Sequence, residues 1–243
     1  YLRTHPLTFE RIADIQNRTD SLPYRQLADS LDYHLLRAKL RAQQGTPADA
    51  VSHFQDTLAE KKYGNEAAQR YGLVAALLRA GDAARAEKEL ELLRKRAPAH
   101  PVIETLAGQV KLATGQTAAA LAHYRAALQN FPQHRALVYD YADALIRNRQ
   151  MDAALKLLAR ALEGFPDDPR LYGLQARSYA ALGKKLQQHQ AQAEAYARQG
   201  NVGAAIDQMQ LALKSGDGDF YQLSSVEARL RELKQIDADN RKP

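Results

Sequence analysis

Histidine side chains are the first candidates for chemistry in this chain, because a neutral imidazole can bind a metal or move a proton near neutral pH. The chain has seven histidines, which are His5, His34, His53, His100, His123, His134 and His189. No two of them are three or four residues apart, so the paired spacing by which one helix holds a zinc ion is missing. Cysteine is absent, which excludes disulfides, cysteine-ligated metal and a cysteine nucleophile.

The short motifs that position catalytic groups are also missing from the sequence. It contains no HExxH, no glycine-rich phosphate loop and no GxSxG. His53 and His123 lie beside bulky apolar positions, and we interpret both as packing or surface residues. We therefore expect no catalytic site within these residues.

A spacing of 34 residues organises most of the chain. His100 and His134 are separated by 34 residues, and four further columns keep the same period. These columns are Pro98, Pro132 and Pro166; Ala86, Ala120 and Ala154; Leu90, Tyr124 and Leu158; and Leu93, Ala127 and Ala161. Alternating small and large residues at these offsets are typical of the tetratricopeptide repeat, a helix–turn–helix unit of 34 residues.

The columns have a physical reason. Two helices approach closely only where one side chain is small, and a bulky residue one turn later fills the space beside it. One unit cannot cover its own apolar face, so stacked units share a continuous core. The sequence thus predicts an all-α superhelix of about four to five helix pairs plus a C-terminal capping helix. The alternative is a plain antiparallel bundle with accidental spacing.

Glycine-containing turns delimit the predicted helices. Turns are expected at the following glycines, where a left-handed residue ends a helix: Gly45, Gly81, Gly115, Gly183 and Gly200. In the unit 135–166 the glycine is replaced by Arg149, and we expect Asn148 to take the left-handed conformation. The polar helix 184–199 should serve in two successive pairs, and a last helix, about 222–236, should cap the array. The tail 237–243 is expected to fray.

Composition excludes several function classes. The net charge is +6 and the pI near 9.4, but basic residues alternate with acidic ones along helix faces, as in residues 83–89. This pattern favours a solvated surface over a nucleic-acid site, and no basic run carries interleaved aromatics. No apolar run approaches the ~18 residues of a membrane span. An acidic protein partner or an anionic membrane surface stays open.

Residues 1–18 carry a more specific signal than any single histidine. They read YLRTHPLTFERIADIQNR, which joins THPL, RIAD and NR to the repeat array. This combination resembles the BepA-type bacterial periplasmic zinc metallopeptidases, which join an HExxH protease domain to tetratricopeptide repeats. The resemblance covers nearly the whole chain, but neither HExxH nor the downstream glutamate ligand is present. Since the protease domain is missing from these residues, we expect the chain to be the C-terminal part of such a protein.

The resemblance implies that the two segments of the chain belong to different domains. Residues 1–23 would be the end of an absent protease domain or a linker, and residues 24–243 the repeat domain. The parent protein would be a zinc metalloendopeptidase, whereas these residues alone would hydrolyse nothing. His5 matches the histidine that reaches the active-site zinc in such proteins and keeps the protease latent; without that zinc it would be an ordinary terminal residue.

The implied function is outer-membrane protein quality control in the periplasm. The repeats would bind the barrel-assembly machinery and present unfolded or stalled outer-membrane proteins to the protease, with no nucleic acid and no transmembrane segment involved. The alternative is a free-standing repeat scaffold or adaptor in envelope assembly or secretion. The client protein and the oligomeric state stay open.

First-helix residues on the inner wall of a repeat superhelix form its groove. By register, the candidates for partner binding are Leu35, Lys39, Tyr71, Ala75, Arg79, Gln109, Tyr139, Asp143 and Arg147. Tyrosine and arginine recur among them, and both types are favoured binding anchors. For Tyr71 and Tyr139 the alternative is simple packing against neighbouring helices. The Lys/Asn set by which chaperone-binding repeats hold a terminal carboxylate is not matched.

Overall fold

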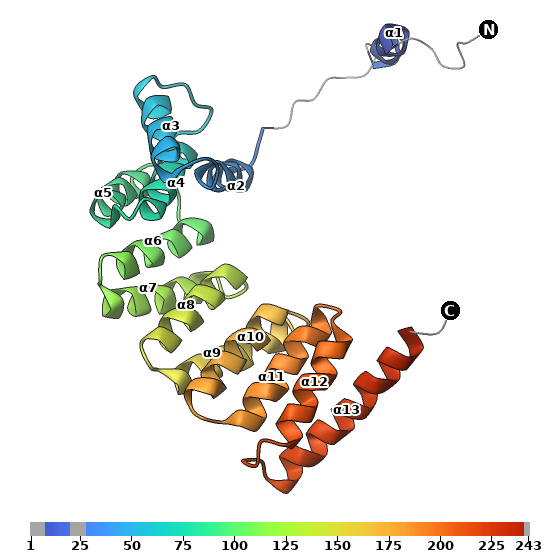
Figure 1. The fold of residues 1–243 in the computed structure, drawn as a ribbon. Helices are drawn as coiled ribbons and strands as arrows, with labels where there is room; N and C mark the ends of the chain where they lie inside the picture. The colour runs from blue at the N-terminus through green and yellow to red at the C-terminus, as the bar shows by residue number, and fades with distance from the viewer. Residues whose placement is uncertain (1–7, 20–27, 241–243) are drawn as a thin grey trace, which may run out of the picture.

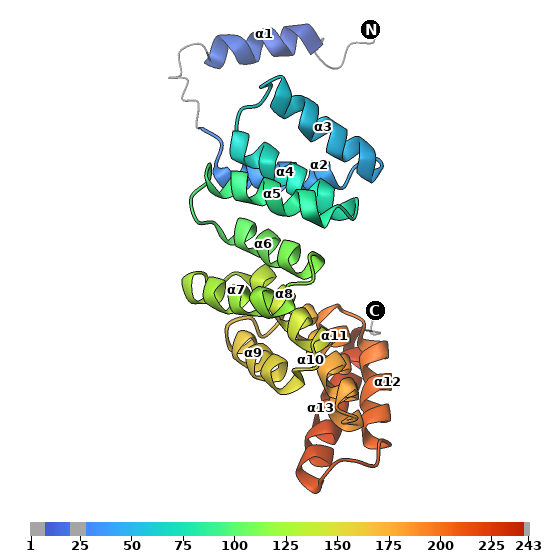
Figure 2. The ribbon, with the colours of Figure 1, turned by 90° about the vertical axis from the view of Figure 1, so that its left-hand side faces the viewer.

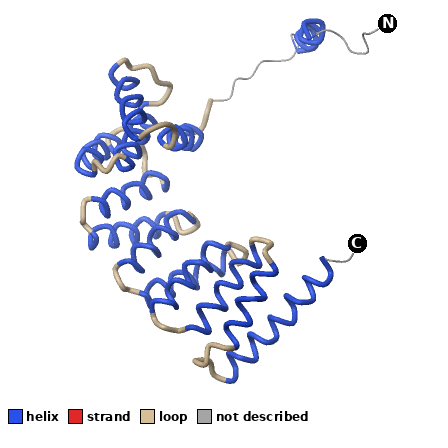
Figure 3. The backbone as a smooth tube through the Cα atoms, in the orientation of Figure 1, coloured by secondary structure: helices blue, strands red, loops and turns tan. Residues whose placement is uncertain are grey.

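The computed structural model describes residues 8–19 and 28–240, and these form helices and loops without a strand (Figure 3). The helices are α1 (Thr8–Thr19), α2 (Leu31–Ala42), α3 (Pro47–Ala59), α4 (Glu66–Arg79), α5 (Ala83–Arg94), α6 (Pro101–Ala113), α7 (Thr117–Asn130), α8 (Arg135–Arg147), α9 (Met151–Gly164), α10 (Pro169–Ala181), α11 (Lys185–Arg198), α12 (Val202–Leu213) and α13 (Phe220–Asn240).

From α2 onward the helices stack as antiparallel pairs into a curved array (Figures 1 and 2). Successive first helices pack on one another, as α2 does on α4, α6 on α8 and α8 on α10, and each second helix also packs on the first helix of the next pair. The first helices therefore lie along the inside of the curve, and α5, α7 and α9 lie on its outer side in Figure 1. The prediction of an all-α superhelix of helix pairs is confirmed.

Capping residues explain where the helices begin. Thr46 Oγ1 accepts a hydrogen bond from the backbone N–H of Asp49 at 3.2 Å, and the Asp49 carboxylate accepts one from the N–H of Thr46 at 3.0 Å. Pro47 follows at the first helical position, where its missing N–H costs nothing. Such reciprocal caps satisfy backbone donors that the first turn of a helix leaves unpaired.

The turns that separate paired helices follow the predicted glycines, with one correction. The backbone of Gly81 has φ +78° and that of Gly115 has φ +76°, a region that glycine enters without steric cost. In the fourth pair the prediction of Asn148 was wrong: Asn148 has φ −89°, and Arg149 carries the positive φ of 56°. The turn needs its left-handed residue at a set distance from the helix end, so position outweighed residue preference.

The core of the array lies where the sequence columns placed it. Ala86, Ala120 and Ala154 have no exposed surface, and Tyr124 and Leu158 beside them are equally buried. These residues belong to clusters that continue from pair to pair. The small columns thus mark the lines of closest helix approach.

The C-terminal helices close the array. Helix α11 packs against both α10 and α12, consistent with a helix that serves in two pairs. Helix α13 buries Val226, Leu230 and Leu233 against α12 and α11. It runs to Asn240, so the expected end near Ile236 and the fraying of residues 237–240 were wrong.

Helix α1 comes before the array and carries Phe9, Ile12 and Ile15 as exposed side chains. The THPL segment with His5 lies outside the described residues. Within residues 8–19 and 28–240, none of the helices is long and apolar enough to cross a membrane.

Candidate functional site

Two adjoining hollows lie along the inner wall of the array and share Gln109 and Ala113 as lining residues. The first hollow lies among α2, α4 and α6 and has a volume of about 410 Å³. The second lies among α6, α7 and α8 and has a volume of about 570 Å³. We call the two adjoining hollows together the inner groove.

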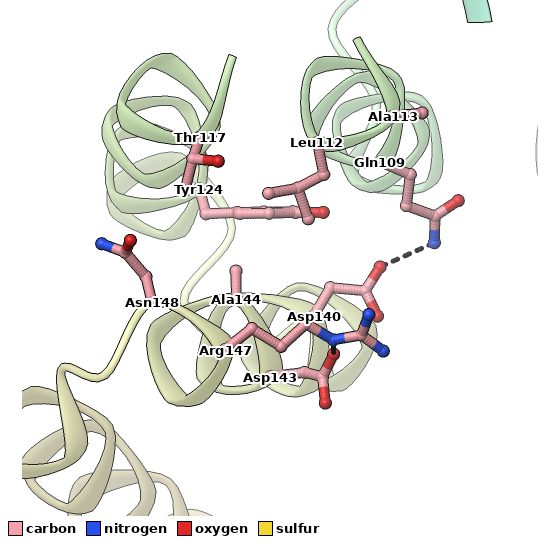
Figure 4. Close-up of a pocket in the computed structure, with 10 residues that line it drawn as sticks. All are labelled: Gln109, Leu112, Ala113, Thr117, Tyr124, Asp140, Asp143, Ala144, Arg147 and Asn148. Atoms are coloured by element: carbon pink, nitrogen blue, oxygen red, sulfur yellow. Dashed lines mark hydrogen bonds and ion pairs between the residues drawn. The ribbon is translucent and has the colours of Figure 1, made fainter. Parts of the chain in front are cut away.

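The wall of the second hollow includes a tyrosine that extends into it from the second helix of a pair. Figure 4 shows Tyr124 extending from α7 toward Gln109 on α6 and Asp140 on α8. The Tyr124 side chain is fully buried, and its hydroxyl has no hydrogen-bond partner among the described residues. Burial, with Asp140 and Asp143 nearby, raises the pKa of this phenol, so it stays protonated at physiological pH.

A glycine makes room for this ring. Gly108 lies on α6 directly beneath Tyr124, where a Cβ atom would be 2.2 Å from Cε1 of the ring. Any side chain at position 108 would occupy the space that the phenol now fills. The local sequence thus lets a large residue cross from α7 into the groove.

An acid pairs with an amide at the boundary of the two hollows. Gln109 Nε2 donates a hydrogen bond to Asp140 Oδ2 at 2.7 Å, and Figure 4 marks this contact. Burial raises the pKa of the Asp140 carboxyl, although the Gln109 hydrogen bond opposes that effect. Among the described residues no cation forms an ion pair with Asp140.

A second acid, Asp143, is already neutralised. It accepts hydrogen bonds from Arg147 Nε at 2.5 Å and from Arg177 Nη1 at 2.7 Å. Burial opposes ionisation, but the two guanidinium groups hold the pKa of Asp143 below its usual range. Arg147 thus pairs with Asp143 while most of its side chain stays exposed to solvent.

The first hollow is lined by basic and aromatic residues. Tyr71 is almost fully buried, and burial raises its pKa to about 12. The Arg79 guanidinium donates to the carbonyl oxygens of Ala42 at 3.1 Å and Gly45 at 2.6 Å, which holds the end of α2 against α4. His134 Nε2 is buried without a partner in the described part of the chain, and burial lowers the pKa of this imidazole.

The residues proposed for partner binding are distributed unevenly over the structure. Five of them line the first hollow, and three line the second with Gln109 common to both: Lys39, Tyr71, Ala75, Arg79, Gln109, Asp143 and Arg147. Leu35 has no exposed surface, belongs to the core and lines neither hollow, so it is not part of the groove wall. Tyr139 lies at the joint of α8 and α10, where its hydroxyl donates to Asp168 and Arg170 stacks 4.4 Å from its ring centroid.

The sequence reasoning missed three groove residues with titratable side chains: Tyr124, Asp140 and His134. A signal for Tyr124 was present, because it is the one hydroxyl-bearing residue in a column otherwise occupied by leucine. Asp140 gave no such signal because it belongs to none of the columns, and the spacing of His134 from His100 did not indicate a place in the groove.

The described residues contain no group of three or more histidine, aspartate or glutamate side chains that could hold a metal ion. His100 and His134 instead occupy equivalent positions just before α6 and α8, as expected for residues between repeats. His123 Nε2 lies 2.9 Å from the Glu104 carbonyl oxygen, which agrees with a packing role.

Comparisons with known proteins agree with this architecture. Residues 111–178 match the family described as tetratricopeptide repeat. The structure is similar to that of MamA from Desulfovibrio magneticus RS-1, with a TM-score of 0.50 and 18% identity over 71% of this chain and 97% of that one. The fold is a tetratricopeptide-repeat superhelix. At this identity the structural likeness concerns the fold alone.

The curated relatives extend the comparison to almost the whole sequence. The chain is 26% identical over 242 residues to the beta-barrel assembly-enhancing protease of Yersinia pestis, covering 99% of this chain and 50% of that protein. It is also 26% identical over 238 residues to the protein of the same name from Escherichia coli K12, covering 97% and 48%. The resemblance to BepA-type proteins is confirmed, and the chain spans about half the length of these relatives.

Proposed function

We propose that this repeat superhelix is the partner-binding part of a periplasmic zinc metallopeptidase that acts in outer-membrane protein quality control. The observation that carries the proposal is the similarity to beta-barrel assembly-enhancing proteases over 97–99% of the chain. Because the chain spans about half of those proteins, the protease domain would belong to the other half. Residues 1–23 would then connect the two parts, and residues 24–243 would form the binding domain.

The inner groove is the surface that we assign to partners. It is concave, is lined by tyrosine, amide and charged side chains on rigid helices, and extends over four helix pairs. An unfolded outer-membrane strand alternates polar and apolar residues along an extended backbone, so it can offer polar side chains to one wall at regular intervals. We propose unfolded or stalled barrel proteins as clients, and the barrel-assembly machinery as a docking partner.

Zinc would be held outside the residues that the structure describes. Bound zinc supplies an activated water for peptide hydrolysis. His5, which also lies outside the described residues, is proposed to restrain that activity in the longer protein. His5→Ala in that protein should raise the rate of casein cleavage, and an unchanged or lower rate in a folded variant contradicts the restraint.

The mass of the native protein in its source cells tests the proposal first. An antibody raised to this chain should detect a species much heavier than 27.0 kDa that retains zinc on purification. A zinc-free species near 27.0 kDa would instead support a free-standing adaptor.

Site-specific photo-crosslinking tests the groove. A photoreactive residue at Gln109 should crosslink to an outer-membrane barrel protein diluted from urea, whereas one at Lys156, exposed on α9, should not. Equal yields at both positions would remove the groove as the binding surface.

A further inference from the structure

Three hydrogen-bond acceptors converge in the hollow among α6, α7 and α8. Asp140 Oδ2 is occupied by Gln109, but Oδ1 accepts no hydrogen bond from any residue that the structure describes. The Gln109 amide nitrogen is used in the same contact, which leaves its carbonyl oxygen as an acceptor. The buried Tyr124 hydroxyl points toward these two groups and has no partner within the described ranges (Figure 4).

These three groups include a carboxylate but no cation that would balance its charge. Burying a carboxylate is unfavourable unless a cation or several donors compensate it. Arg147 is engaged by Asp143, so it does not fill that role. Lys39 and Arg170 are near enough to favour the Asp140 charge but form no ion pair with it. The hollow therefore has room and acceptors for a cationic group that the chain does not itself supply.

The walls of the same hollow suit an aliphatic stem. Leu112, Ala113 and Ala144 line it alongside the polar groups, and the volume is about 570 Å³. An arginine side chain has an apolar stem and a planar head with five N–H donors and no acceptor. A lysine head is a compact point charge with three donors, so it matches three spread acceptors less well.

We propose that this hollow is a subsite for one basic side chain, arginine in preference to lysine, of an extended peptide bound along the inner groove. Asp140 binds the guanidinium by a charge-assisted hydrogen bond, while Gln109 Oε1 and the Tyr124 hydroxyl accept from its remaining N–H groups. The inference rests on the proposed peptide-binding function of the groove and adds the chemistry of one contact. It makes the bound segment of a client recognisable by a basic residue.

A pair of synthetic peptides tests the subsite without altering the protein. One is a ten-residue peptide of alternating threonine and valine with a single central arginine. The other has citrulline at that position, which keeps the shape of arginine and removes its charge. We expect the arginine peptide to bind about tenfold more tightly by fluorescence anisotropy at pH 7, because charge-assisted hydrogen bonds are the stronger kind.

Two variants assign the preference to the proposed residues. Asp140→Asn should abolish the preference for arginine over citrulline, and Tyr124→Phe should weaken binding of the arginine peptide about threefold. The matched controls are Asp152→Asn, an exposed acid on α9, and Tyr141→Phe, whose hydroxyl accepts from Arg125. Both controls should bind as the unaltered chain does.

The outcomes separate the subsite from the groove. Equal affinity for the two peptides, or a preference that survives Asp140→Asn, overturns the subsite and leaves the groove proposal standing. If neither peptide binds while the crosslink at Gln109 forms, the subsite is overturned and the groove stands. If neither peptide binds and no crosslink forms, both proposals are wrong.

Discussion

The ring of Tyr124 on α7 fills the space that a side chain at Gly108 on α6 would need. A Cβ atom at position 108 would lie 2.2 Å from Cε1 and Cζ of that ring and 2.6 Å from its hydroxyl oxygen. Phe54 has the same relationship to Gly72, where a Cβ would be 2.2 Å from the ring. In both places a glycine on a first helix admits an aromatic residue from a second helix, which ties neighbouring helices together.

Gly108→Ala should therefore destabilise the array by ~1–3 kcal/mol, since an added methyl in a packed site forces its neighbours to move. Urea unfolding measures the change. Gly173→Ala, inside α10, is the matched control, because nothing lies within 4 Å of a Cβ there. The control should gain ~0.5–1 kcal/mol from helix propensity alone. Equal effects at both positions would contradict the packing of Tyr124 against Gly108.

Ala154→Asp should destabilise the structure by ~3 kcal/mol or more, because it places an unpaired charge at a position with no exposed surface. The loss should appear as cooperative unfolding at lower temperature, since neighbouring repeats share their core. Ala153→Asp, at an exposed position in the first turn of α9, should stay within ~0.5 kcal/mol of the original. Unchanged thermal unfolding of Ala154→Asp would show that the repeat register is wrong.

Arg79→Ala should loosen the first helix pair without melting the rest. The guanidinium bonds to carbonyl oxygens of Ala42, Gln44 and Gly45 are lost, and because Arg79 is exposed to solvent they contribute together only ~1 kcal/mol. Hydrogen exchange should accelerate in α2 and α3 but not in α8 or α10. Arg160→Ala, at an exposed position of α9, provides the control. Protection unchanged in α2 would mean that Arg79 does not hold that helix.

Stability should fall between pH 10 and pH 12. Burial raises the pKa of Tyr71 from 10.0 to about 12, so in this window the unfolded chain releases the phenol proton and the folded chain keeps it. The stabilising difference is present below pH 10 and is lost as pH rises through the folded pKa, by ~3 kcal/mol for this group. Tyr71→Phe should show a smaller decline in urea midpoint over that range, and an identical decline contradicts the assignment.

Sequence periodicity was sufficient for the repeat architecture. The alanine columns and the glycine turns are local requirements of helix packing and turn geometry, so each can be recognised from residue types alone. Sequence periodicity failed at the turn of the fourth pair, where the residue preference of Asn148 and the geometry of the turn disagreed. The turn geometry gave the left-handed conformation to Arg149. Sequence periodicity also ended the last helix too early, because α13 continues past Leu233, its last buried residue, through polar residues such as Gln235, which donates to Asp239.

The residues of the inner groove were harder to predict from the sequence than the helices and turns. Register alone assigned Leu35 to the groove wall, yet α4 packs over α2 and buries it fully. The convergence of Tyr124, Gln109 and Asp140 involves three helices and one glycine contact, and no column of the sequence contains it.

The sequence by itself determined the helices, their order and the spacing of the core, because these depend on residues close together along the chain. Only the tertiary structure decided which side chains meet in the groove, because a meeting across helices depends on how each pair is rotated against the next. That rotation is set by the combined packing of all the side chains between the helices, and no single residue or spacing encodes it.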